Sequence, residues 1–155
     1  MNVIIYLEKP TVHLEMMIFF ETIHEHALSI DFAMFVVIWI VQIIIYPSFR
    51  YISEDDFLQW HGKYCNQIAV FVLPLMVTQV LECLTSCFFV GDTASWVRLI
   101  GVILAWVVTF FHSARKHQYL SVEGKKIAVI KSLLGGNWIR TFLWSLVFIT
   151  SVISY

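Results

Sequence analysis

The sequence predicts an all-α integral membrane protein, a four-transmembrane-helix antiparallel bundle. Hydrophobic residues make up 59% of the 155 residues and charged residues 14%, against roughly 45–50% and 25% in an ordinary soluble domain. Four apolar segments, at about 28–49, 66–90, 97–113 and 138–155, each approach the length that a hydrocarbon core of about 30 Å requires. A single integral-membrane domain over residues 1–155 is therefore expected, in contact with the lipid bilayer.

The region before the first span does not resemble a secretory signal. It holds acidic residues and lacks a basic start followed by a small-residue cleavage site. Residues 14–26, "LEMMIFFETIHEH", mix apolar residues with Glu and His at a helical spacing. They predict an additional N-terminal amphipathic helix, on the membrane surface or continuous with the first span.

Proline, glycine and capping residues set the expected limits of the spans. Pro47 in "YPSF" is expected where the first span ends, and Pro74 is expected to kink the second. The polar "GDTAS" (91–95) predicts a short turn into the third span. In "GGNW" (135–138) the glycines are expected to break the helix, with Asn137 as N-cap of the last span.

The distribution of Lys and Arg predicts the orientation. With four spans, the 47–65 and 114–137 connections share one side, which holds Arg50, Lys63, Arg115, Lys116, Lys125, Lys126 and Lys131, while the other side holds only Lys9 and Arg98. The positive-inside rule places both connections in the cytoplasm and both termini on the non-cytoplasmic side.

Each span carries one stripe of polar residues at helical spacing, which is expected to face the bundle interior because polar groups in lipid are costly. Asp31, Glu82 and Arg98 fall at a similar depth near the outer ends of three spans. We expect them to form a buried structural ion pair cluster, an interpretation favoured over a proton or ion path.

A second polar cluster is expected near the cytoplasmic face. His61 and His112 lie on neighbouring antiparallel spans, where two facing histidines can hold a haem b iron axially or contribute to a metal site. Ordinary hydrogen-bonded histidines at the interface are the commoner case. His117 lies about 140° around a helix from His112, so both face one ligand only if the helix ends near Ala114.

The same face suggests an anion site, because Arg115 and Arg140 flank the expected helix start at Asn137. An anionic lipid head or substrate would fit, although cytoplasmic basic residues also contact ordinary lipid phosphates. The predicted ligand-binding set is Tyr46, His61, Tyr64, His112, Arg115, His117, Asn137 and Arg140. The cysteines are interpreted as free thiols that fill interior space.

The patterns "YPSF", "WH..Y", "VLPLM..Q", "FH", "KH" and "NWIRT" over about residues 46–144 are similar to those of small four-helix bacterial membrane proteins, loosely similar to the anthrone-oxygenase-like group. This resemblance implies a bacterial inner (plasma) membrane location. It also singles out Tyr46, Pro47, His61, Tyr64, His112, His117, Asn137, Arg140 and Thr141. It assigns no catalytic residue and does not decide whether the protein is an enzyme.

Two functional classes remain open from the sequence. One is a membrane protein whose His/Arg-lined pocket binds a haem, metal ion, quinone or anionic lipid head. The other is a non-catalytic assembly subunit of a homo-oligomer or larger membrane complex. No phosphate loop, nucleophile elbow or nucleic-acid motif occurs in the sequence, so a nucleic-acid partner is not expected.

Overall fold

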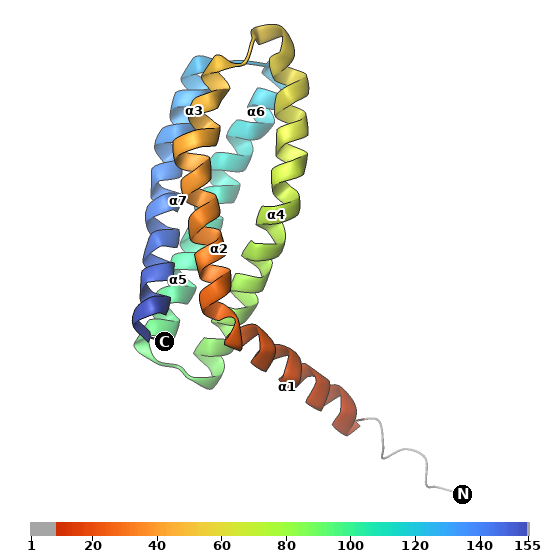
Figure 1. The fold of residues 1–155 in the computed structure, drawn as a ribbon, viewed down its shortest axis with the longest axis vertical. Coiled ribbons are helices and arrows are strands. Elements are labelled where there is room, and N and C mark those ends of the chain that lie inside the picture. The colour runs from red at the N-terminus through yellow and green to blue at the C-terminus, as the bar shows by residue number, and fades with distance from the viewer. Residues whose placement is uncertain (1–8, 155) are drawn as a thin grey trace, which may run out of the picture.

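The computed structural model describes residues 9–154, and these contain helices but no strand. Four helical stretches are long and apolar enough to cross a membrane: Ala27–Tyr51, Glu54–Phe89, Thr93–Glu123 and Ile127–Ser154. They lie side by side along one long axis (Figure 1). The predicted all-helical class with four membrane-spanning stretches is therefore confirmed. Tyr155, the last residue of the predicted fourth span, lies outside the described residues.

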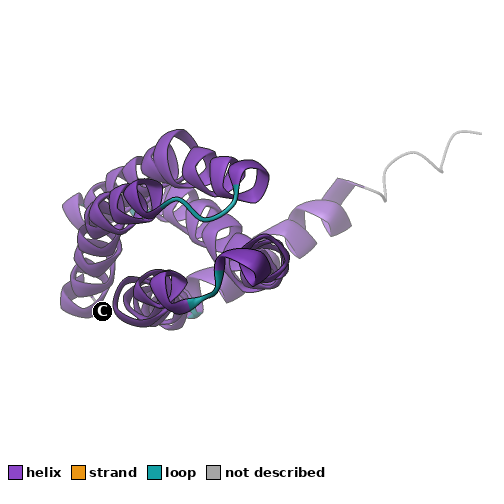
Figure 2. Ribbon diagram, turned by 90° about the horizontal axis from the view of Figure 1, so that it is seen from above, coloured by secondary structure: helices purple, strands orange, loops and turns teal. Residues whose placement is uncertain are grey.

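The predicted N-terminal helix is present as α1 (Lys9–Glu25), which projects from one end of the bundle (Figures 1 and 2). The chain turns at His26 and enters the first stretch, which is built from α2 (Ala27–Ile40), η1 (Val41–Ile45), α3 (Tyr46–Ser48) and η2 (Phe49–Tyr51). Within this stretch η1 is a π-helical turn. The helical stretch thus continues past Pro47 to Tyr51.

The second stretch is one helix, α4 (Glu54–Phe89), which begins well before the apolar segment expected at 66–90. Ser53 caps it by accepting a hydrogen bond from the backbone N–H of Asp56, 3.2 Å away. The first turn is acidic, and carboxylates there interact favourably with the helix dipole. Polar residues such as His61 therefore lie within the helix, because local capping and not hydropathy fixes its start.

The third stretch also exceeds its predicted limits. It comprises α5 (Thr93–Val108), a second π-helical turn η3 (Thr109–Ala114), and α6 (Arg115–Glu123). Asp92 caps α5 by accepting from the backbone N–H of Ser95 at 2.8 Å. Hydrogen bonds from Ser95 lower the pKa of Asp92, which lies between two spans. Gly124, with φ +74°, ends α6 in the left-handed conformation that glycine adopts most readily.

The fourth stretch, α7 (Ile127–Ser154), corrects the predicted break at "GGNW", because the helix runs through both glycines. Asn137 is therefore no N-cap: it is fully buried, and its amide nitrogen donates to Gln42 Oε1 at 2.8 Å. Packing outweighs the low helix propensity of glycine, since Ile130 and Leu133 are also fully buried.

The helices form a closed ring of contacts, in which α2 and α5 each pack against both α4 and α7. Figure 2 shows this arrangement from above. Small residues permit the closest approach between α5 and α7: a Cβ at Gly101 would lie 2.8 Å from Val147 Cγ2. Small residues at helix interfaces commonly allow such close packing of membrane helices.

The outer surface of the bundle is apolar. Only 22–33% of the most apolar window in each stretch is buried within the protein. Large side chains such as Phe111 and Phe142 are about two-thirds exposed. Such continuous apolar exposure is typical of a surface in contact with lipid and supports a multi-pass integral membrane protein.

Candidate metal centre

Three metal-ligating side chains meet at the end of the bundle that holds the α6–α7 connection. His61 and Cys65 are one turn apart on α4, and His117 reaches them from α6. Nε2 of His61 lies 3.0 Å from Nδ1 of His117, and Sγ of Cys65 lies 3.6 Å from each of these nitrogens. The structure thus brings two imidazole nitrogens and one thiol sulfur to a common point.

These separations are close to those of donor atoms around one metal ion. An ion with metal–nitrogen bonds of about 2.0 Å and metal–sulfur bonds of about 2.3 Å in tetrahedral geometry separates its ligand atoms by about 3.3–3.6 Å. The two sulfur–nitrogen distances already match. The nitrogen–nitrogen distance needs to widen by only about 0.3 Å.

The second nitrogen of each imidazole ring has its own hydrogen-bonding partner. Nδ1 of His61 lies 3.1 Å from Ser121 Oγ, and Nε2 of His117 lies 2.9 Å from the Tyr46 hydroxyl. In metal sites the outer nitrogen of a histidine ligand almost always donates to such a group, which fixes the tautomer and turns the lone pair toward the metal. The other two nitrogens, His61 Nε2 and His117 Nδ1, lie within hydrogen-bond distance of each other and are the pair that a metal ion would take as ligands.

Aromatic rings form a packed shell against the two histidines of the cluster. The ring of Phe57 stacks on His61 with centroids 5.3 Å apart, and Phe49 packs edge-on against both histidines. Tyr64 lies beside them and stacks on Trp60. His61 is completely buried. This shell restrains both imidazole rings, while Cys65 and His117 are partly exposed.

Arg140, on α7, is joined to the cluster through the Tyr46 hydroxyl, which contacts His117. Its Nη1 donates to Tyr46 (3.5 Å), Ser113 (3.3 Å) and Asn137 (3.0 Å), and its guanidinium lies 5.0 Å from the ring centre of Trp144. The side chain is 6% exposed. Among the described residues no carboxylate forms an ion pair with it, so a buried positive charge lies one hydrogen bond from Tyr46.

The expected pairing of His61 with His112 is wrong: the partner of His61 is His117. The reason is the π-helical turn η3, which adds about one residue to a turn and so rotates the following residues by about 100° relative to an α-helix. The ring of His112 instead packs against α7, where a Cβ on Gly136 would lie 2.6 Å from its Nδ1. Axial haem ligation by His61 and His117 is also excluded, because nitrogens 3.0 Å apart leave no room for a macrocycle between them.

The remaining residues of the predicted set are divided between the cluster and its surroundings. Tyr46 contacts His117, Tyr64 lies beside both histidines, and Arg140 donates a hydrogen bond to Tyr46. Arg115 is exposed, with its guanidinium 5.6 Å from the Phe111 ring centre, and is not joined to Arg140. No helix begins at Asn137, so the predicted anion site at a helix N-terminus does not form.

Cys65 is a third candidate ligand, although the sequence indicates only a free thiol that fills interior space. In the structure its sulfur lies 3.6 Å from one nitrogen of each imidazole. The signal in the sequence was the spacing of His61 and Cys65, four residues apart and thus on one helix face.

At the opposite end of the bundle the structure brings Asp31, Glu82 and Arg98 together, as the sequence predicts. Arg98 donates to Asp31 Oδ2 from Nη2 at 2.9 Å and to Glu82 Oε1 from Nη1 at 3.2 Å. Both carboxylates are 1% exposed. Polar neighbours complete the network: Gln79 and Ser151 donate to Asp31, and Ser86 donates to Glu82.

Comparison with known proteins adds no assignment to this geometry. No family model, curated protein or solved structure matches the chain.

Proposed function

We propose that this protein is an integral membrane protein that binds one copper(I) ion through His61, Cys65 and His117. The observation that carries the proposal is the geometry of the three donor atoms, with separations of 3.0, 3.6 and 3.6 Å. The hydrogen-bonded outer nitrogens of both rings add to it.

An ion suits this cluster better than the organic ligands considered from the sequence. Four cavities of the described residues are lined by other side chains, at the opposite end of the bundle and on its lipid-facing sides. The histidines of the cluster are packed against a shell of aromatic rings. A quinone or lipid head would have to displace that shell, whereas a single ion requires only small shifts of the ligands.

Charge favours a monovalent ion. A thiolate with two neutral imidazoles is a soft donor set that suits copper(I) and zinc(II). With copper(I) the site is neutral, whereas zinc(II) would leave one net positive charge near Arg140, which has no acidic partner among the described residues. Because like charges repel strongly when buried, the neutral copper(I) site costs less.

In this proposal the copper(I) site lies at the cytoplasmic end of an antiparallel bundle. Both connections at that end, Ile52–Ser53 and Gly124–Lys126, lie among basic residues. Lys125 ties the two connections together by donating to the carbonyl oxygens of Arg50 (2.9 Å) and Ile52. The positive-inside rule then places both termini outside. Three protein ligands leave a coordination position for a further donor, such as the thiol of a chaperone or chelator.

Copper binding is tested by titration of the purified protein under anaerobic conditions against a chromogenic copper(I) chelator. One equivalent is expected to bind, and X-ray absorption is expected to show two nitrogen donors and one sulfur donor. Cys65→Ser, His61→Ala and His117→Ala should each weaken binding by at least about tenfold, equivalent to about 1.4 kcal/mol. Cys87→Ser and His112→Ala serve as matched controls and should bind like the original protein.

Two results would contradict the proposal. Zinc bound in preference to copper(I) would show that Arg140 does not set the charge of the site. If no metal binds, or if the controls lose binding as strongly as the three ligand variants, the site hypothesis fails and the assembly-subunit interpretation takes its place.

A further inference from the structure

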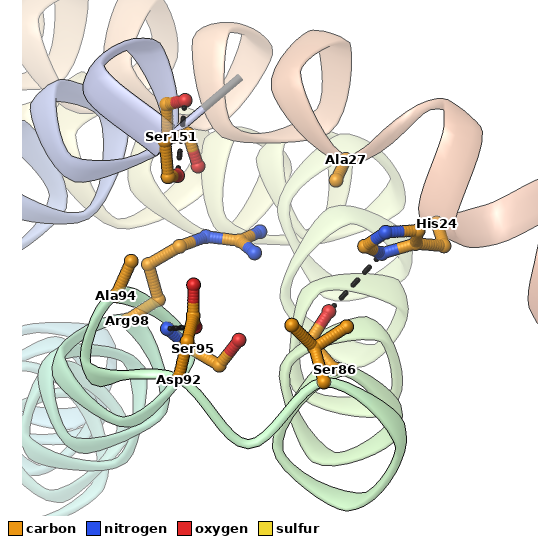
Figure 3. A pocket seen from close by; sticks show the side chains of 10 residues that line it. His24, Ala27, Ser86, Asp92, Ala94, Ser95, Arg98 and Ser151 are labelled. Atoms are coloured by element: carbon orange, nitrogen blue, oxygen red, sulfur yellow. Dashed lines mark hydrogen bonds between the residues drawn. The ribbon is translucent and has the colours of Figure 1, made fainter.

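A polar cavity of about 270 Å³ opens at the end of the bundle opposite to the cluster of His61, Cys65 and His117. Figure 3 shows His24, Ser86, Ser95, Arg98 and Ser151 around one space, although they come from α1, α4, α5 and α7. His24 Nδ1 lies 3.1 Å from both Ser86 Oγ and Glu82 Oε1, which joins α1 to the buried ion cluster.

The formal charges around this cavity are predominantly negative. Asp31 and Glu82 contribute two negative charges behind its wall, and Arg98 supplies one positive charge. Asp92, held ionised by its hydrogen bonds with Ser95, lines the cavity and adds a further negative charge. The surplus is two negative charges when His24 is neutral and one when it is protonated. The cavity therefore favours a cationic group over an anion.

An apolar groove of about 480 Å³ lies beside this cavity. It lies between α1 and the end of α4, and its lining includes Met17, Phe20, Phe88 and Phe89. Phe88 and Phe89 are 84% and 71% exposed. His24, Ser86 and Val90 line both the polar cavity and the groove, so the two are direct neighbours.

We propose that this composite site binds a bilayer lipid whose head carries a primary ammonium group. The ammonium group occupies the polar cavity, and a hydrocarbon chain lies in the groove. A primary ammonium offers three hydrogen-bond donors, and Asp92, Ser86 and Ser151 offer oxygen acceptors around the cavity. The apolar groove favours a lipid over a soluble amine, because a soluble amine would leave the exposed phenylalanines uncovered.

The test uses the full chain in nanodiscs of equal parts phosphatidylethanolamine, phosphatidylcholine and phosphatidylglycerol, followed by gentle release and native mass spectrometry. Phosphatidylcholine is the matched control, since its head has the same charge but no N–H donor. Phosphatidylethanolamine is expected to be retained at least about tenfold over phosphatidylcholine and more strongly still over anionic phosphatidylglycerol.

Two variants separate the two parts of the site. Asp92→Asn keeps an effective helix cap but removes a negative charge. It should reduce the preference for phosphatidylethanolamine. Unchanged helical content by circular dichroism would show that the fold is kept. Phe20→Ala should weaken retention of all lipids, whereas Phe142→Ala, on an exposed face of α7, should not.

Equal retention of the ethanolamine and choline lipids would overturn the ammonium assignment, and a preference for phosphatidylglycerol would overturn the charge argument. Displacement of the lipid by millimolar free ethanolamine would show that a soluble amine is the ligand and would also overturn the proposal. Copper titration is independent of these measurements, so a failure here leaves the metal site untouched.

Discussion

Replacement of Arg98 by methionine should destabilise the protein far more than replacement of Glu82 by glutamine. The buried cluster holds two carboxylates for one guanidinium, and all three side chains are at most 7% exposed. Arg98→Met leaves two like charges without a cation. Glu82→Gln removes the surplus negative charge and leaves Arg98 paired with Asp31. The asymmetry follows from the stoichiometry of the charges and not from the number of bonds lost.

The expected loss of stability for each replacement follows from the burial of these charges. Loss of one partner of a buried ion pair costs about 3–5 kcal/mol, which for a chain of this size corresponds to a fall in melting temperature of about 6–20 °C. Glu82→Gln keeps the acceptor oxygen that receives Ser86 and Arg98 Nη1 but loses the charged bond from Arg98 Nη2. That loss is worth about 1.5–3 kcal/mol, and removal of a buried surplus charge offsets part of it.

The assay is thermal unfolding in detergent, followed by tryptophan fluorescence. Trp144 reports on this region because its indole N–H donates to Gln79, which in turn donates to Asp31. A combined replacement of the three charged residues by apolar residues should recover much of the stability lost in Arg98→Met. A loss in Glu82→Gln equal to or larger than that in Arg98→Met would refute the reasoning.

Three further predictions follow from other contacts. Gly136→Ala should lower the free energy of unfolding by about 1–3 kcal/mol, because the added methyl group overpacks against the His112 ring. Adding His112→Ala should restore most of the lost stability in the same unfolding assay. No restoration would contradict this contact. Tyr46→Phe should weaken copper(I) binding by about 10–100-fold while X-ray absorption shows unchanged ligands, and an unchanged affinity would argue against its role. In a chain without native cysteines, an impermeant maleimide applied to intact cells should label Thr93→Cys but not Lys126→Cys, and the inverse pattern would reverse the proposed orientation.

The sequence was sufficient to predict the class of fold and the cluster of Asp31, Glu82 and Arg98. Apolar segments of membrane-spanning length require only local composition, because each transmembrane helix satisfies its own backbone hydrogen bonds. Asp31, Glu82 and Arg98 could be matched by depth because each lies near the same end of its span. Helix limits were less predictable: hydropathy missed the polar first turns of α4 and the passage of α7 through Gly135 and Gly136.

The identity of the candidate metal ligands was decided by the tertiary structure. His61 was recognised as an interior residue from the sequence, but its partner depended on the rotation of the third stretch after Val108. A π-helical turn there leaves no clear mark in composition, yet it changes the direction of every side chain that follows. The sequence by itself therefore determined that four apolar helices carry polar side chains into a membrane. Only the packing of those helices, and the wide turn at Thr109–Ala114, decided that His117 and Cys65 meet His61, because side-chain direction after such a turn depends on contacts with neighbouring helices.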